Sequence, residues 1–259
     1  AQRSDQYVLV DDIADIQRAK REAKLAIAFD IEGAVSLGKQ ISMLALYHRL
    51  GVRQIHFVYN INNEAGGGCH DEDEGLTDFG RDLVDEVNRL GMLLDLSHVG
   101  YRTSMEITER SSAPVIYSHS NPKALADHPR NITDEQMRAC AATGGVVAVT
   151  GAGRFLGDPD AKPESLVRAI DTAVSRIGIE SIGIGLDHTF VPHFFSRPPK
   201  IWPPEYYSGT FNSVGPYDLI RVAEILLKKG YSDNDIKSIY GGNLLRVASK
   251  VWSSGLGII

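Results

Sequence analysis

Short apolar runs alternate with amphipathic stretches along most of the chain. Six runs are rich in Val, Ile, Leu or aromatic residues: LAIAFDIEG (25–33), VRQIHFVYN (52–60), MLLDLSHV (92–99), APVIYSHS (113–120), GVVAVTG (145–151) and SIGIGLDH (181–188). Apolar runs of this length are typical of strands that are buried on both faces of a parallel sheet. The pattern therefore predicts six parallel strands.

The stretches between these runs have the apolar spacing of amphipathic helices. Helices are predicted over residues 14–23, 36–51, 77–91, 101–112, 133–144, 163–178, 217–230 and 233–252. Thr77, Thr133 and Ser232 stand where N-caps are expected, and Gly91 and Gly230 where C-caps are expected. Because strands and helices alternate, the strands should run parallel through right-handed crossovers. A doubly wound sheet and a (β/α)8 barrel are the two candidate folds.

Polar side chains gather at the carboxyl ends of the predicted strands. They are Asp30, Glu32, Tyr59, Asn60, Asp95, His98, His119, Asp187 and His188. A barrel builds its active site from several strand ends at one rim, whereas a doubly wound sheet uses one switch point with a glycine-rich loop, which GAGRF (151–155) does not match. The sequence predicts an α/β (β/α)8 TIM barrel as a single domain over residues 1–259. Such a barrel has eight strands, so the first two are expected to be missing from this chain.

Composition narrows the functional classes. The 259 residues carry a formal net charge of -6 without a Lys/Arg cluster, which argues against nucleic-acid binding. No apolar run approaches the roughly 20 residues of a transmembrane helix. Cys69 and Cys140 have no metal-finger or CxxC spacing and are expected to be free thiols. The start, AQRSDQYVLV, lacks both an initiator Met and a signal-peptide pattern. It indicates a processed or cut chain, with a cytoplasmic location favoured and a periplasmic one if a signal was removed.

Two consecutive predicted strands finish in Ser-His, at His98 and His119. A single strand histidine is more often a hydrogen-bonded core residue, but two at the same depth on adjacent strands aim two imidazoles at one point. Imidazole is the commonest nitrogen ligand of zinc, and Glu32 can supply the third ligand of a catalytic zinc that keeps one position open. The alternative for Glu32 is a helix N-cap.

Other polar residues near the rim have both functional and structural interpretations. Asp187 could transfer protons or anchor a substrate amine, or it could cap a helix. Arg130 could hold a carboxylate through two hydrogen bonds, or it could lie on the surface. The acidic segment 70–74 is interpreted as a solvated loop rather than a cation site. The segment 190–215, rich in Pro and aromatic residues, predicts a lid or a partner-contact loop.

Several segments match a known family in order along the chain. They are FDIEGAVSL (29–37), YNINNEAGGGC (59–69), GLTDFGRDLVDEVNRLGMLLDLSHVG (75–100), APVIYSHSNPKAL (113–125), HPRNITDEQM (128–137), GIGLDH (183–188) and DLIRVAEILLKKGYSDNDIKSIYGGNLLRV (218–247). Together they resemble the membrane (renal) dipeptidase family of zinc peptidases, which are amidohydrolase-like barrels. The resemblance covers nearly the whole chain.

The resemblance implies zinc-dependent hydrolysis of dipeptides by a metal-activated water, in a barrel that holds two zinc ions. It assigns Glu32 to the carboxylate that bridges the two metals, and His98 and His119 to the second metal. The family often tolerates a D-residue at the C-terminal position of the dipeptide.

The resemblance also implies how a substrate is held. Arg130 matches the residue that binds the substrate carboxylate, with Asn131 beside it, and Asp187 matches the catalytic acidic residue at the end of the last strand. Tyr59 falls where animal members have a substrate-binding histidine. Bacterial members often read Tyr-Asn there, so Tyr59 indicates a bacterial type.

The chain departs from the family at its start. The family's first strand carries a His-x-Asp motif that binds the first metal, and this sequence has no such motif. The chain is therefore expected to begin in the helix before the third strand, and to hold one zinc ion or none. Either an upstream segment completes the barrel, or a homo-oligomer covers its open edges. The alternative function is a catalytically impaired relative that binds a ligand or partner, and another amidohydrolase, such as a deaminase or lactonase, would show different metal ligands.

Overall fold

Six parallel strands form the central sheet of the protein. The computed structural model describes residues 3–190 and 212–252. Within these, the strands are β3 (Phe29–Glu32), β4 (Val52–His56), β5 (Leu93–Asp95), β6 (Val115–Tyr117), β7 (Val146–Val149) and β8 (Ile182–Ile184). They are hydrogen-bonded in sequence order, each parallel to the next. This order is that of a (β/α)8 barrel and lacks the reversal of a doubly wound sheet, so the predicted strands and fold class are confirmed.

The first predicted strand, residues 25–33, is divided between two sheets. Its first part, β2 (Leu25–Ile27), pairs in parallel with β1 (Tyr7–Leu9), which the apolar pattern did not predict. The helix α1 (Ile13–Arg21) connects these two strands. The second part is β3, which pairs with β4 instead. One apolar run therefore serves two sheets, because its two halves hydrogen-bond to different partners.

Helices follow most of the strands along the chain. They are η1 (Ala34–Leu37), α2 (Ser42–Arg49), α3 (Asp78–Leu90), α4 (Tyr101–Arg110), α5 (Asp134–Ala142), α6 (Pro163–Ile177), η2 (Ile179–Ser181), η5 (Pro216–Asp218), α7 (Leu219–Lys228), α8 (Asp233–Lys237), η6 (Ser238–Gly242) and α9 (Asn243–Trp252). Two predicted helices are interrupted. The helix predicted over 36–51 breaks after Gly38, whose φ is 56°, and the one predicted over 233–252 breaks at Gly241, whose φ is 141°. These left-handed conformations favour glycine and cannot continue a right-handed helix.

The ends of the helices follow the predicted capping residues. The hydroxyls of Thr77, Thr133 and Ser232 accept hydrogen bonds from backbone N–H groups in the first turns of α3, α5 and α8. Gly91 and Gly230 follow α3 and α7 with positive φ values of 68° and 95°. The predicted caps are therefore confirmed.

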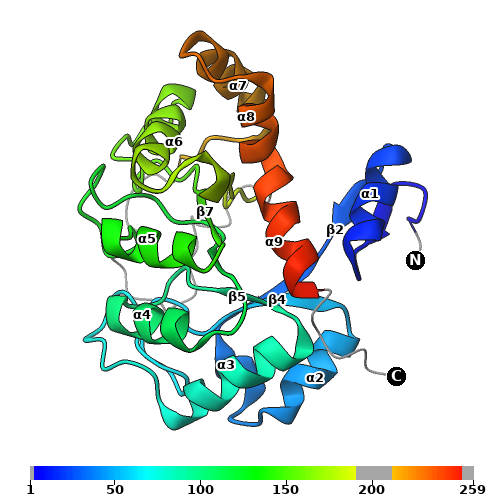
Figure 1. The fold of residues 1–259 in the computed structure, drawn as a ribbon, viewed down its shortest axis with the longest axis vertical. Coiled ribbons are helices and arrows are strands. Elements are labelled where there is room, and N and C mark those ends of the chain that lie inside the picture. Colours follow the sequence, from blue (N-terminus) through cyan, green and yellow to red (C-terminus); the bar gives the residue numbers. More distant parts are fainter. Residues whose placement is uncertain (1–2, 191–211, 253–259) are drawn as a thin grey trace.

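Helices cover both sides of the six-stranded sheet. α3 to α6 follow one another along one side, and α9 lies on the other (Figure 1). Leu93 and Leu94 show the division, because neighbouring residues on a strand point to opposite faces. Leu94 belongs to the main core with Leu83 of α3, whereas Leu93 packs in a smaller cluster with Val247 and Val251 of α9. Apolar side chains thus occupy both faces, and the polar side chains lie beyond them at the carboxyl ends of the strands.

Two further sequence expectations concern segments outside the core. In the part of the chain that the structure describes, no helix combines the length and apolar character needed to cross a bilayer. Most of the segment 190–215, predicted to be a lid or partner-contact loop, lies outside the described residues.

Candidate metal centre

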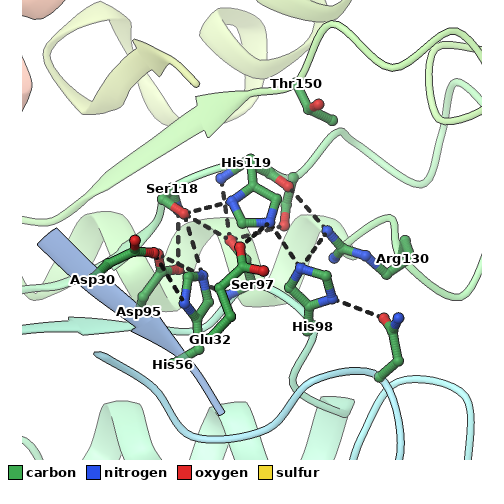
Figure 2. A network of polar contacts seen from close by, with 12 residues as sticks. Asp30, Glu32, His56, Asp95, Ser97, His98, Ser118, His119, Arg130 and Thr150 are labelled. Atoms are coloured by element: carbon green, nitrogen blue, oxygen red, sulfur yellow. Dashed lines mark hydrogen bonds and ion pairs between the residues drawn. The ribbon is translucent and has the colours of Figure 1, made fainter. Parts of the chain in front are cut away.

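The carboxyl ends of three neighbouring strands bring charged residues side by side. Glu32 on β3 is the register partner of His56 on β4, and His56 is the register partner of Asp95 on β5. His98 and His119 follow shortly after the ends of β5 and β6. Figure 2 shows these five side chains grouped at one point above the sheet. The structure therefore brings together Glu32, His98 and His119, as the sequence predicts.

The two Ser-His histidines face each other through their Nε2 atoms, which are 2.8 Å apart. The Nδ1 atom of His98 lies 2.8 Å from Asn60 Oδ1, and that of His119 lies 2.6 Å from Ser118 Oγ. Because an amide oxygen can only accept a hydrogen bond, His98 carries its proton on Nδ1 and presents a lone pair on Nε2. Burial lowers the pKa of His98 well below its usual range and that of His119 to about 4. Buried, uncharged imidazole nitrogens that converge in this way fit a zinc ion.

Glu32 adds a carboxylate to the same point. Its Oε1 atom lies 3.7 Å from His119 Nε2. Glu32, His56 and His119 each offer one ligand atom, and these three atoms lie within 4.8 Å of one another. Desolvation by the surrounding protein raises the pKa of Glu32 to about 7, although 39% of its side-chain surface remains accessible. A bound divalent cation would favour the ionised carboxylate.

His56 is a site residue that the sequence did not reveal. It lies inside an apolar run, is 0% exposed, and places Nε2 2.9 Å from Asp95 Oδ2. Burial alone would lower the pKa of His56, but the charge and hydrogen bond of Asp95, helped by Glu32 and Asp30, raise it to about 9. The same ion pair holds the pKa of buried Asp95 well below its usual range. The only sequence signal was a polar residue among buried strand positions, next to a strand that ends in Asp95.

Arg130 is buried beside the histidines, with 4% of its surface exposed, so its surface alternative is wrong. Its Nη2 lies 3.2 Å from His98 Nε2 and 3.5 Å from the carbonyl oxygen of His119. The guanidinium also lies 5.4 Å from the centre of the Phe155 ring. Arg130 lines a cavity of about 300 Å³, which is also bordered by Cys69, His98, Tyr101, Lys123 and Asn131. This volume is at the lower end of the range for small-molecule sites.

The two other predicted substrate-binding residues are Tyr59 and Asn131. The Tyr59 ring is stacked on the His98 ring, with centroids 4.3 Å apart and an angle of 25° between the planes. Asn131 Nδ2 donates to the carbonyl oxygens of Ala126 and Phe155, each at 2.9 Å. Its buried Oδ1 has no hydrogen-bond partner within the described residues. Tyr59 therefore covers one face of the His98 ring. Asn131 holds the loop that carries Arg130 in place.

Asp187 lies farther out at the same rim. It is exposed and follows the end of β8. Its charge acts on His119, because it partly opposes the lowering of the His119 pKa by burial. Asp187, Asn60 and His98 all have left-handed backbone conformations, with φ values of 53°, 66° and 71°. Such conformations are uncommon for residues other than glycine and tend to gather at functional sites.

The acidic segment 70–74 makes structural contacts. Asp71 accepts a hydrogen bond from the backbone N–H of Asn62, and Asp73 accepts bonds from the backbone N–H groups of Gly75 and Thr103. These bonds support a structural role for the segment. Cys69 and Cys140 are free thiols, as predicted.

Comparison with protein families gives one match that covers most of the chain. Residues 1–198 match a family described as membrane dipeptidase (peptidase family M19). Dipeptidase verJ of Clonostachys rogersoniana is 32% identical over 258 residues, which are 96% of this chain and 61% of that protein. Dipeptidase tcpJ of Claviceps purpurea is 30% identical over 254 residues, which are 96% of this chain and 56% of that protein. The chain thus spans little more than half the length of these curated relatives.

A solved structure has the same fold over nearly the whole chain. It is an amidohydrolase from Pseudomonas aeruginosa, 32% identical to this chain, with a TM-score of 0.88. The similarity covers 97% of this chain and 81% of the solved one. The amidohydrolase-like fold predicted from the sequence is therefore confirmed.

Proposed function

Since this chain belongs to the membrane dipeptidase family, we propose that it hydrolyses dipeptides with a zinc ion held by Glu32, His98 and His119. The observation that carries the proposal is the approach of two imidazole nitrogens to 2.8 Å, with a carboxylate oxygen 3.7 Å from one of them. Two histidines and one glutamate form a recognised ligand set for a catalytic zinc that keeps one position open. The relatives named above as dipeptidases support the substrate class.

The charge state and ring orientation of the two histidines already suit metal binding in the metal-free protein. Zinc, when bound, supplies a Lewis acid for the scissile carbonyl and lowers the pKa of the water that attacks it. Because burial keeps His98 and His119 uncharged at neutral pH, the two rings have no net positive charge to lose when a metal binds. Asn60 and Ser118 fix the two rings through Nδ1. Bonds of this kind hold a ligand ring in the orientation and tautomer that a metal requires.

Arg130 would select dipeptides by binding their terminal carboxylate. A guanidinium forms two parallel hydrogen bonds with a carboxylate, and Arg130 Nη2 lies only 3.2 Å from a metal-ligand nitrogen. In a dipeptide whose terminal carboxylate is bound by Arg130, the single peptide bond would lie beside the metal ligands. In a longer peptide, either the scissile bond would lie too far from the metal ligands, or the additional residue would press against the cavity wall. Asn131 would help by accepting a substrate N–H through its unpaired Oδ1.

Asp187 would move the proton in this reaction. Its carboxylate lies at the rim, exposed to solvent, and its charge reaches His119. An acid at this place can hold a proton taken from the attacking water and give it to the leaving amine, which must be protonated to depart. Tyr59, stacked on the His98 ring, would contact the bound substrate.

The proposal is tested by assaying the purified chain against dipeptides and tripeptides, with its zinc content measured in parallel. Hydrolysis of dipeptides that stops with a chelator and returns with zinc is the expected result, and tripeptides should remain intact. Zinc-loaded protein that binds dipeptides without cleaving them would reject the enzyme and support a binding protein.

Replacing Asn60 with alanine should weaken zinc binding by about 10- to 100-fold, the usual cost of losing a group that orients a metal ligand. The His98 ring would lose the acceptor that keeps its proton on Nδ1. Competition with a chromophoric chelator measures this affinity. Asn60→Asp is the matched control, because a carboxylate still accepts the Nδ1 proton. Equal affinity in Asn60→Ala and the unaltered protein would contradict the role of Asn60.

Zinc affinity should fall by about tenfold per pH unit as the pH drops from 7 to 5, because one proton must leave Glu32 when the metal binds. The pKa of Glu32 is raised to about 7, so this carboxyl is protonated below that pH in the metal-free protein. His119, with its pKa lowered to about 4, adds no proton in this range. Titration calorimetry at several pH values gives the slope. Glu32→Gln should bind more weakly but without this slope, and a slope of two protons would contradict the prediction.

A further inference from the structure

Arg130 lies in a tight turn of the loop between β6 and α5. The carbonyl oxygen of His128 accepts a hydrogen bond from the backbone N–H of Asn131 at 2.9 Å, which closes a four-residue turn over 128–131. Pro129 is the second residue of this turn, a place that its fixed φ favours. His128 Nδ1 also accepts the backbone N–H of Arg130, at 3.1 Å. His128 therefore holds Asn131 through its main chain and Arg130 through its side chain.

Phe155, in the loop that follows β7, contacts the same turn at three points. Its carbonyl oxygen accepts a hydrogen bond from Asn131 Nδ2 at 2.9 Å. Its ring centroid lies 4.8 Å from that of the His128 ring, with 56° between the two planes. The guanidinium carbon of Arg130 lies 5.4 Å from the same ring centroid. Because all three contacted residues belong to one turn, the buried Phe155 restrains that turn as a unit.

The guanidinium of Arg130 is supported by groups that carry no negative charge. Besides the Phe155 ring, its neighbours include His98 Nε2 and the carbonyl oxygen of His119. His98 Nε2 is also a proposed zinc ligand, so in the metal-bound protein the ring and the carbonyl remain. The face of an aromatic ring attracts a cation without neutralising it. A carboxylate in that place would compete with the substrate, whereas the ring leaves the positive charge of Arg130 available.

The protonation state of His128 agrees with its hydrogen bond to Arg130. An imidazole nitrogen accepts a hydrogen bond only when it carries no proton. Burial, followed by the surrounding basic groups, lowers the pKa of His128 to about 4. At neutral pH the ring is therefore uncharged, with a lone pair on Nδ1 and the proton on Nε2. An uncharged ring also adds no repulsion to the neighbouring guanidinium.

From these contacts we propose that Phe155 and His128 are positioning residues for Arg130, which they hold in the orientation that receives the substrate carboxylate. The inference rests on the proposed role of Arg130 in substrate binding. A guanidinium must be ordered before it can form two parallel hydrogen bonds, and ordering it in advance lowers the entropic cost of binding. Loss of this positioning should weaken carboxylate binding without changing the chemical step at the metal ligands.

The experiment measures kcat and KM for alanylalanine and for its C-terminal amide. Phe155→Leu removes the ring face and should raise KM for alanylalanine by about 3- to 30-fold, the range for a cation–aromatic contact that is partly or fully desolvated. We expect kcat to stay unchanged, as for a lost binding interaction, and KM for the amide to stay unchanged as well. Phe155→Tyr keeps the ring and should retain the original KM. Phe79→Leu, a change in α3 against the main core, is the matched control and should alter neither constant.

A second pair of variants tests the hydrogen bond of His128. His128→Leu removes the acceptor for the Arg130 N–H and should raise KM for alanylalanine by about 2- to 10-fold, the net contribution of one hydrogen bond. His128→Asn offers an amide oxygen near the place of Nδ1 and should recover most of this loss. If Phe155→Leu fails to fold, these two variants decide, because His128 is only partly buried.

An unchanged KM in Phe155→Leu, or equal rises for alanylalanine and its amide, would overturn the inference, while cleavage of alanylalanine would keep the proposed function. If the protein cleaves no dipeptide, titration calorimetry with alanylalanine replaces the kinetics. Weaker binding in Phe155→Leu at unchanged zinc content would then keep the positioning role and reject the enzyme. Equal binding of alanylalanine and its amide by the unaltered protein would reject both.

Discussion

His119→Ala should abolish zinc binding by the Glu32, His98 and His119 site and lower kcat/KM for dipeptides by at least about a thousandfold. His119 is the residue that links the others, since its Nε2 lies 2.8 Å from His98 Nε2 and 3.7 Å from Glu32 Oε1. A catalytic metal contributes several kcal/mol to the transition state, and each 1.4 kcal/mol corresponds to a factor of ten in rate. Elemental analysis and steady-state kinetics measure the two losses together.

The control for His119→Ala is His48→Ala, which removes an imidazole from α2 and should change neither quantity. Circular dichroism should show the same helix content in both variants. Addition of free imidazole provides a further check, because a small ligand can enter the space left by the side chain and restore part of the zinc binding. Zinc content and turnover equal to those of the unaltered protein would show that His119 is a core histidine and not a ligand.

Arg130→Ala should lower kcat/KM for dipeptides with a free carboxylate by about 30- to 5,000-fold. This range corresponds to the roughly 2–5 kcal/mol lost when one partner of a buried charged pair is removed. Arg130 is 4% exposed and lines the cavity beside His98, so water cannot replace its guanidinium well. Dipeptides with an amidated C-terminus lack the charge that Arg130 would bind, and they should react equally with both proteins.

Arg130 also contacts His98 Nε2, so its loss could act through the metal ligand instead. Zinc content separates the two effects, and it should be unchanged in Arg130→Ala. Arg130→Lys keeps the charge but loses the planar pair of donors, and it should recover only part of the activity. Equal losses on free and amidated dipeptides would show that Arg130 does not bind the carboxylate.

Much of the fold could be predicted from local patterns. Each of the six apolar runs contains one strand of the six-stranded sheet, although β3 is largely exposed and not buried as predicted. The capping residues Thr77, Thr133 and Ser232 marked helix starts correctly. These features depend on residues close together in the chain, and so sequence alone reveals them. The run 25–33 was misjudged because its pairing partners, β1 and β4, belong to different sheets. Strand pairing is a contact between distant segments, which periodicity does not report.

The sequence by itself determined that His98, His119 and Glu32 would lie at one rim, because parallel strands in sequential order end on the same side of a barrel. Only the tertiary structure decided what those side chains touch. The hold of Asn60 on His98 depends on a left-handed turn after β4, and the pairing of His56 with Asp95 depends on the register of β4 against β5. Burial of Arg130 likewise follows from packing of its loop against Phe155 and the histidines. The sequence shows which residues can bind a metal. Their protonation states and hydrogen-bond partners depend on the desolvation and the neighbouring groups that folding creates.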